Sequence, residues 1–465
     1  MVDVDRKTNM KMSNNISNKS PKLSTKPEFS IPPPSTVRAA ELEPASDSAC
    51  SAYEQYINLS KLKKLWESNE FPGWTNESLL KPALQGLELT FRFVSTAMFD
   101  PRPYTNRKEW KKRLESLAMT QVEIIAMLSE EIEQKVNQTS PNELKNVKSK
   151  TLESTPIIIE SRISEASLLP RLATWEKTED IAQKVYYTME REMLNLPFSL
   201  GLGEPNTSRK PSLDYDLICK PLSLHALKQN TIISQNYEDQ TLHTIHQLLE
   251  TWIHVSKMVL EKLVTIISSK DFEKASSFCW LLEKIWKLLS DIEETHLLMD
   301  PGDFLRLKNQ LSIKAVAEAE LFCFRSRGLI EITKMSKDLR HKVPEILEVA
   351  VDPMGGPRIQ EAAMRLYRRK EGCERIHLLQ ALQAVEMAVK KFYYSYKQLL
   401  VIVMGSLEAT ANKGVGNPDS SGDLLDQIIF EPTYYPSLDA AKTFLGYYWS
   451  HKSGIWSRGS HNQLS

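Results

Sequence analysis

Hydrophobic residues recur at helical spacing along most of the chain. In the first half, one such segment runs from Tyr53 to Trp66 and a second covers residues 79–98. A third segment begins near Thr105 and places large apolar residues on one stripe: Trp110, Leu114, Leu117, Val122, Ile125 and Leu128. We expect these three helices to pack together as an N-terminal helical layer.

Longer helical patterns follow in the second half of the chain. A fourth helix is predicted over residues 175–196, and further helices over 239–268, 271–297, 312–336, 357–370 and 374–411. No segment shows the alternation of apolar and polar residues that is typical of a β-strand. The pattern therefore predicts an all-α fold, a multi-helix bundle.

Composition changes along the chain and suggests where its regions begin and end. Residues 1–48 are rich in Ser, Asn, Lys and Pro and poor in large apolar residues, which predicts a disordered N-terminal tail. We expect an N-terminal helical region at 49–200, a loop-rich connector at 201–236 and a C-terminal helical domain at 237–465.

Charge and cysteine content exclude several classes of protein. Lys and Arg total 59, as do Asp and Glu, so the chain has no net charge and we expect no nucleic-acid partner. The five cysteines are scattered and form no CxxC pair, which argues against a disulfide framework or a thiolate zinc site. We predict no metal site.

The chain has no predicted route into or across a membrane. Its first 36 residues lack the apolar core of a signal peptide, and no run approaches the about 18 apolar residues of a spanning helix. We therefore expect a cytoplasmic protein with no membrane partner, and basic stretches at 107–113 and 365–370 leave nuclear entry as an alternative.

Three histidines and a glutamate cluster in the predicted helix 239–268. At about 100° per residue, His243, Glu250 and His254 lie opposite the apolar stripe, while His246 lies on its flank. We interpret the first three as a solvated polar face and His246 as a structural histidine. A zinc site is the alternative, but no HExxH motif is present.

The basic stretch at 107–113 is unusual for its position at the start of a helix. Cations there oppose the helix dipole, so something other than helix stability has to account for them. A solvated face is one interpretation, and a partner-docking surface or nuclear signal is the other. The candidate partner surface comprises Arg107, Lys108, Lys111, Lys112 and Arg113. No P-loop, GxSxG or kinase motif occurs, and we predict no enzymatic activity.

Four long segments are distinctive: AYEQYINLSKLKKLW, LKPALQGLELTFRFV, DPRPYTNRKEWKKRLESL and EITKMSKDLRHKVPEILEVAVDPMGGPRIQEAAMRLYRR. They resemble the plant HSPRO family, the nematode-resistance-like proteins, and the resemblance covers essentially the whole chain. It implies a non-catalytic regulator of basal defence and stress responses, linked to salicylate signalling. It also implies binding to the regulatory βγ subunit of the sucrose-nonfermenting-related kinase.

A second resemblance covers about residues 239–425 and includes HQLLETW, which starts at His246, and LMDPGDFL. HQLLETW is similar to the HQxxExW of the heme tryptophan dioxygenases, whose histidine lines the distal heme pocket, and LMDPGDFL resembles another of their segments. Phe324 and Arg325 stand where they carry the Phe-Arg pair that holds the substrate carboxylate. Four further residues resemble their substrate loop: Gly414, Gly416, Ser420 and Ser421. The resemblance implies a dioxygenase-like bundle in the C-terminal half.

One departure from the dioxygenases bears directly on chemistry. The position of their proximal heme histidine is occupied by Tyr396, so the resemblance does not supply the axial ligand of their iron. We therefore predict no cofactor. The alternative hypothesis is a heme- or small-indole-binding protein whose pocket is lined by His246, Trp252, Arg325 and Tyr396, together with Phe324 and the loop residues named above.

Overall fold

Helices form every named element of the described part of the chain, which confirms the all-α prediction. The computed structural model describes residues 47–67, 77–102, 106–137, 164–196, 198–203, 212–228, 237–310, 325–350, 357–369, 372–405 and 424–459. Within these ranges, the only β-type pairing is an isolated parallel bridge between Ser199 and Ser212. The predicted tail lies outside them, except that α1 already begins at Asp47.

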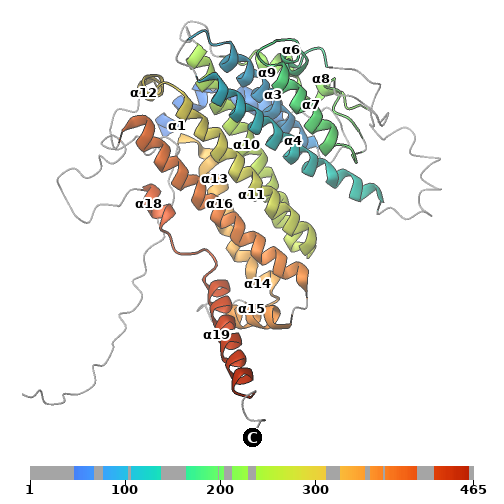
Figure 1. Ribbon diagram of the computed structural model, residues 1–465, viewed down its shortest axis with the longest axis vertical. Helices are drawn as coiled ribbons and strands as arrows, with labels where there is room; N and C mark the ends of the chain where they lie inside the picture. The colour runs from blue at the N-terminus through green and yellow to red at the C-terminus, as the bar shows by residue number, and fades with distance from the viewer. Residues whose placement is uncertain are drawn as a thin grey trace, which may run out of the picture. The chain divides into compact units, whose positions relative to one another are not determined.

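Three long helices form the centre of the bundle (Figure 1). They are α10 (Tyr237–Ser268), α11 (Phe272–Glu294) and α16 (Cys373–Met404), and their bounds agree with the predicted segments to within a few residues at most ends. A short turn joins α10 to α11, with Lys270 at a φ of 63° and the Asp271 carboxylate accepting from the Lys274 amide. Helix α16 packs along α11, and Gly405 ends it at a φ of 85°.

The predicted N-terminal layer is present and packs on the central helices. Helix α3 (Glu77–Phe99) lies against α10, and α4 (Arg107–Asn137) lies against α3 and α11. Helix α7 (Glu179–Glu192) covers α4 and is shorter than predicted, since the chain makes turns on both sides of it.

The first predicted helix is in fact two helices, so the prediction of one continuous helix was wrong. Helix α1 (Asp47–Tyr56) and α2 (Leu59–Glu67) are separated at Asn58, whose φ is 57°. Asparagine adopts this left-handed conformation more readily than most residues. Apolar spacing continues across the break, so periodicity alone did not reveal it.

Short helices complete the bundle. Helices α6 (Leu168–Leu172), α8 (Tyr215–Cys219) and α9 (Pro221–His225) pack on α3. The others are α12 (Pro301–Gln310), α13 (Arg327–Asp338), α14 (Val343–Ile346), α15 (Pro357–Arg369), α18 (Leu424–Ile429) and α19 (Pro436–Gly459), with two 3-10 segments, η1 (Thr295–Leu298) and η4 (Leu339–Lys342). Parts of the predicted helices 312–336 and 374–411 lie outside the described residues.

All described residues belong to one compact unit, Glu41–Ser465. The boundaries predicted near residues 200 and 236 stay predictions. Helices on both sides of them pack together inside this unit. No described helix combines the length and apolar character needed to cross a membrane.

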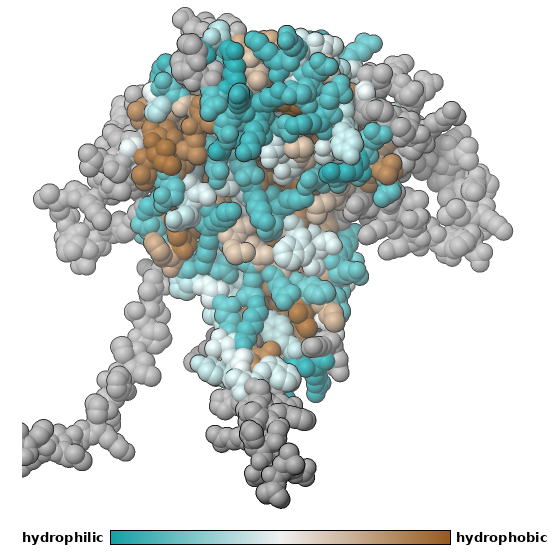
Figure 2. All heavy atoms as spheres, in the orientation of Figure 1, coloured by the Kyte–Doolittle hydropathy of each residue, from teal (hydrophilic) through white to brown (hydrophobic). Residues whose placement is uncertain are grey.

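The face shown in Figure 2 is mostly hydrophilic, with a few apolar groups. The largest of these lies over the C-terminal end of α16. That end has the sequence LLVIVM, in which the Ile402 side chain is 66% exposed.

Candidate functional site

His243 and Glu250 on the histidine face of α10 are buried and His254 is half-buried, so the interpretation of this face as a solvated polar face was wrong. His243 is 2% exposed and Glu250 is 4% exposed. Helices α1 and α2 cover them: the ring of Tyr56 meets His243 edge-on at 5.4 Å, and Trp66 stacks on His254 at 4.5 Å. Helix α10 is therefore enclosed by α1 and α2 on one side and α3 on another.

Burial strongly shifts the titration of these groups. It lowers the pKa of His243 to about 3, with the nearby Arg92 charge adding to the effect, and the pKa of His254 to about 4. Burial also raises the pKa of Glu250 to about 7, although Ser326 and Tyr53 donate hydrogen bonds to its carboxylate. Within the described ranges, no group of three His, Cys, Asp or Glu side chains is placed to hold a metal ion.

The described residues of the predicted ligand pocket do not all line one space, because Trp252 does not line the cavity beside His246. The His246 ring lies near Tyr53 and His296, at 5.7 and 5.5 Å between centroids. Trp252 instead turns toward the N-terminal layer, where its Nε1 donates to Gln121 Oε1 at 2.9 Å. Arg325 and Tyr396 are both buried at 2% exposure. Phe324, Gly414, Gly416, Ser420 and Ser421 lie outside the described residues.

The space beside His246 is too small for a heme. The cavity lined by His246, Glu250, Ser326 and Phe392 has a volume of about 20 Å³, which holds about one water molecule. Tyr396 lies next to it in the core, its ring stacked on Phe392 at 6.4 Å. The described residues therefore do not fit a heme.

The basic stretch at 107–113 is partly used inside the molecule. Arg107 donates to the Asp100 carbonyl at 2.8 Å, Lys111 pairs with Asp180 of α7, and Arg113 pairs with Glu109 at 3.1 Å and with Glu294 of α11 at 3.7 Å. These partners explain why cations stand at the start of α4 despite its dipole. Lys108 and Lys112 are exposed and form no ion pair with a described residue.

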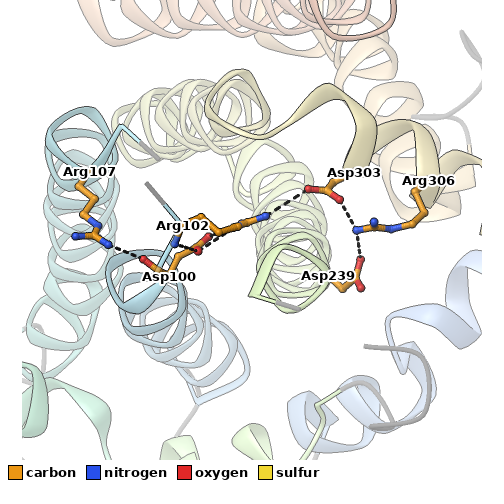
Figure 3. Close-up of polar contacts among 6 residues, drawn as sticks. All are labelled: Asp100, Arg102, Arg107, Asp239, Asp303 and Arg306. Atoms are coloured by element: carbon orange, nitrogen blue, oxygen red, sulfur yellow. Dashed lines mark hydrogen bonds and ion pairs between the residues drawn. The ribbon is translucent and has the colours of Figure 1, made fainter. Parts of the chain in front are cut away.

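A row of charged side chains connects the start of α4 with α12 and α10 (Figure 3). Asp100 holds Arg102, which reaches Asp303 of α12 at 3.6 Å. Arg306 then joins Asp303 to Asp239 of α10. Asp303, which belongs to the dioxygenase-like segment LMDPGDFL, thus serves here to attach α12 to its neighbours.

A buried carboxylate in α3 is the most highly connected polar group on the other side of the layer. Glu88 is fully buried and accepts four hydrogen bonds: from Ser167 Oγ at 2.7 Å, the Leu168 amide at 2.8 Å, Tyr215 OH at 3.0 Å and His225 Nε2 at 2.8 Å. These partners come from α6, α8 and α9 and the residue before α6. Glu88 therefore fixes three short helices onto α3.

Beside Glu88 lies a cavity of about 320 Å³ between α3, α6, α9 and α10. Three of its lining residues carry a positive charge, Arg92, Arg171 and Lys228, and none is acidic. Two histidines, His225 and His243, complete its polar lining on this side. Sequence reasoning missed this cavity. The available signal was Arg92 itself, a charged residue within the apolar run LTFRFV of a predicted helix.

The molecule is thus an all-α protein whose internal carboxylates and cations mostly serve to join helices. Sequence comparison places it: the model of the Hs1pro-1 N-terminus matches residues 1–190, and that of the Hs1pro-1 protein C-terminus matches residues 193–451. The chain belongs to the Hs1pro-1 family.

Two relatives from Arabidopsis thaliana match almost the whole chain. Nematode resistance protein-like HSPRO2 is 48% identical, covering 97% of this chain and 100% of the relative. Nematode resistance protein-like HSPRO1 is 48% identical, covering 92% of this chain and 97% of the relative. Neither name states a catalytic activity. No solved structure matches this chain, so the resemblance to tryptophan dioxygenases stays a prediction.

Proposed function

We propose that this protein is a non-catalytic regulator of plant defence and stress signalling. The observation that carries the proposal is the match to two nematode resistance protein-like chains over nearly their full lengths. The surroundings of α10 support a structural role for its polar side chains. Aromatic rings and hydrogen-bonding groups of neighbouring helices cover its histidines and Glu250.

The protein acts by binding a partner protein, the regulatory βγ subunit of the sucrose-nonfermenting-related kinase. Lys108 and Lys112 on the exposed side of α4 are the candidate contact. They differ from Arg107, Lys111 and Arg113, which are already engaged by groups of this chain. Exposed cations at an interface rim act mainly by steering association, so salt will weaken the interaction.

The test measures binding of the purified full-length chain to the purified βγ subunit at two salt concentrations. Reversing both charges, in Lys108→Glu with Lys112→Glu, is expected to weaken binding by about tenfold at low salt. The matched control is Lys61→Glu with Lys64→Glu, which reverses two exposed lysines on α2 and is expected to leave binding unchanged. Absence of binding by the unmodified chain would refute the partner, and equal binding by both variants would refute the surface.

A further inference from the structure

Arg92 is a buried cation with no carboxylate partner among the described residues. Its side chain is 5% exposed, Nη1 donates to the Leu224 carbonyl at 3.3 Å, and Nη2 donates to the Gln247 side-chain oxygen. Nε has no hydrogen-bond partner within the described ranges. Burying a charge in this way is costly unless an opposite charge compensates it.

Glu88 does not supply that compensation directly. It lies one turn earlier on the same helix, and its charge raises the pKa of Arg92, but burial outweighs it and lowers that pKa to about 10. Arg92 therefore remains a cation at neutral pH. The Glu88 carboxylate is occupied by its four donors and forms no ion pair with Arg92.

The charged side chains that line this cavity with Arg92 are cations. Arg171 and Lys228 contribute exposed charges that make no ion pair with any described residue. His243 forms a hydrogen bond with the Tyr56 backbone. Neither His243 Nε2 nor His225 Nδ1 has a hydrogen-bond partner among the described residues. The arrangement combines a buried guanidinium with flexible cations nearer to solvent, and focuses positive potential in one cleft.

The cavity also has an apolar part. Phe99, Leu168 and Leu222 line it, and Leu222 is 71% exposed. Its volume of about 320 Å³ is at the lower end of ligand pockets, which span about 300–1,000 Å³. A ligand of this size with both a charge and a hydrocarbon part would satisfy both kinds of lining.

We propose that this cavity binds a small organic anion, a carboxylate or a phosphate ester. The anionic group pairs with Arg92, and the apolar part of the ligand packs against Phe99 and Leu168. Arg171 and Lys228 attract the anion and hold it from the solvent side. This site is separate from Lys108 and Lys112, so it and the partner surface can be tested independently.

Titration calorimetry on the full-length chain tests the proposal with four probes: benzoate, phenyl phosphate, inorganic phosphate and neutral benzamide. We expect benzoate or phenyl phosphate to bind at least tenfold more tightly than benzamide. Benzoate alone would assign a carboxylate ligand, and phenyl phosphate alone would assign a phosphate ester. Binding of inorganic phosphate alone, equal binding of benzamide, or no binding of either organic anion would overturn the proposal.

Variants then locate the binding. Arg92→Gln is expected to weaken binding of the organic anion about 10- to 100-fold, the range for loss of a hydrogen bond to a charged group. Because Arg92 is buried, its replacement also affects folding, so Arg171→Gln with Lys228→Gln provides a second test at exposed positions, with an expected loss of about 3- to 10-fold. Lys61→Gln with Lys64→Gln is the matched control. Unchanged affinity in the Arg171 and Lys228 double variant would contradict this placement.

Discussion

At Gly86, the absence of a side chain is what allows α3 and α10 to pack closely. A Cβ atom placed there would lie 2.7 Å from Trp252 Nε1, the atom that donates to Gln121. Gly86→Ala gains about 1 kcal/mol of helix propensity, but overpacking costs about 1–3 kcal/mol and loss of the buried hydrogen bond about 1–3 kcal/mol more. We expect a net loss of about 1–5 kcal/mol in the free energy of unfolding, measured by denaturant titration.

Gly446 provides the control for that substitution. It lies in α19, and a Cβ there would meet nothing within 4 Å. Gly446→Ala is expected to leave stability unchanged or raise it by up to about 1 kcal/mol. If Gly86→Ala behaved like Gly446→Ala, Trp252 would be free to move, and a ligand-binding role for its ring would regain support.

Glu250 makes stability depend on pH in an unusual direction for a carboxylate. Its pKa is raised from 4.5 to about 7 by burial, so between these values the folded chain holds a proton that the unfolded chain has lost. This contribution is complete below pH 4.5 and is lost as the pH rises to 7. Glu250→Gln is expected to raise the free energy of unfolding by about 2–3 kcal/mol at pH 8 and to leave it unchanged at pH 4.5.

The buried histidines act in the opposite direction, so the comparison has to be made against the unmodified chain at each pH. The pKa values of His243 and His254 are lowered, to about 3 and about 4. Their stabilising contribution is complete above pH 6.5 and is lost as the pH falls. The difference between the free energies of unfolding of Glu250→Gln and of the unmodified chain, taken at each pH, isolates the contribution of Glu250. If that difference did not change with pH, the Glu250 carboxyl would ionise normally in the folded chain.

At the scale of whole helices, periodicity predicted what depends on local sequence and failed where distant partners decide. The bounds of α3, α10 and α11 follow from apolar spacing and from turn residues such as Asp271. The residues that surround α10 could not be predicted from apolar spacing. A helical wheel assumes one buried and one solvated face, whereas α10 is enclosed by helices from distant parts of the chain.

The same limit explains how much of the candidate sites could be predicted. His246 was expected near the core, and it is buried; that expectation came from its position beside the apolar stripe. The cavity at Arg92 needs residues from α3, α6, α9 and α10, which are brought together only by tertiary packing. The ion pair of Arg113 with Glu294 likewise joins segments far apart in sequence, and so does that of Arg102 with Asp303 (Figure 3).

At the scale of the molecule, the two halves recognised by sequence comparison meet in one core. The division falls between residues 190 and 193, at the end of α7. Contacts nevertheless cross it: Trp252 of α10 bonds Gln121 of α4, Arg92 of α3 bonds Gln247 of α10, and Lys284 of α11 pairs with Glu123 of α4 at 2.7 Å. The halves are therefore parts of one packed unit.

We expect neither half, 1–192 or 193–465, to fold cooperatively alone. Separation would expose the buried faces of α3 and α10, at about 1.5–3 kcal/mol for each large apolar side chain, against a total stability of about 5–15 kcal/mol. Far-ultraviolet circular dichroism and tryptophan fluorescence should show coincident thermal transitions for the full chain and broad, early ones for each half. Halves produced together should co-purify and regain the full-chain transition, whereas an isolated half that melts within a few degrees of the full chain would show that the boundary separates independent domains.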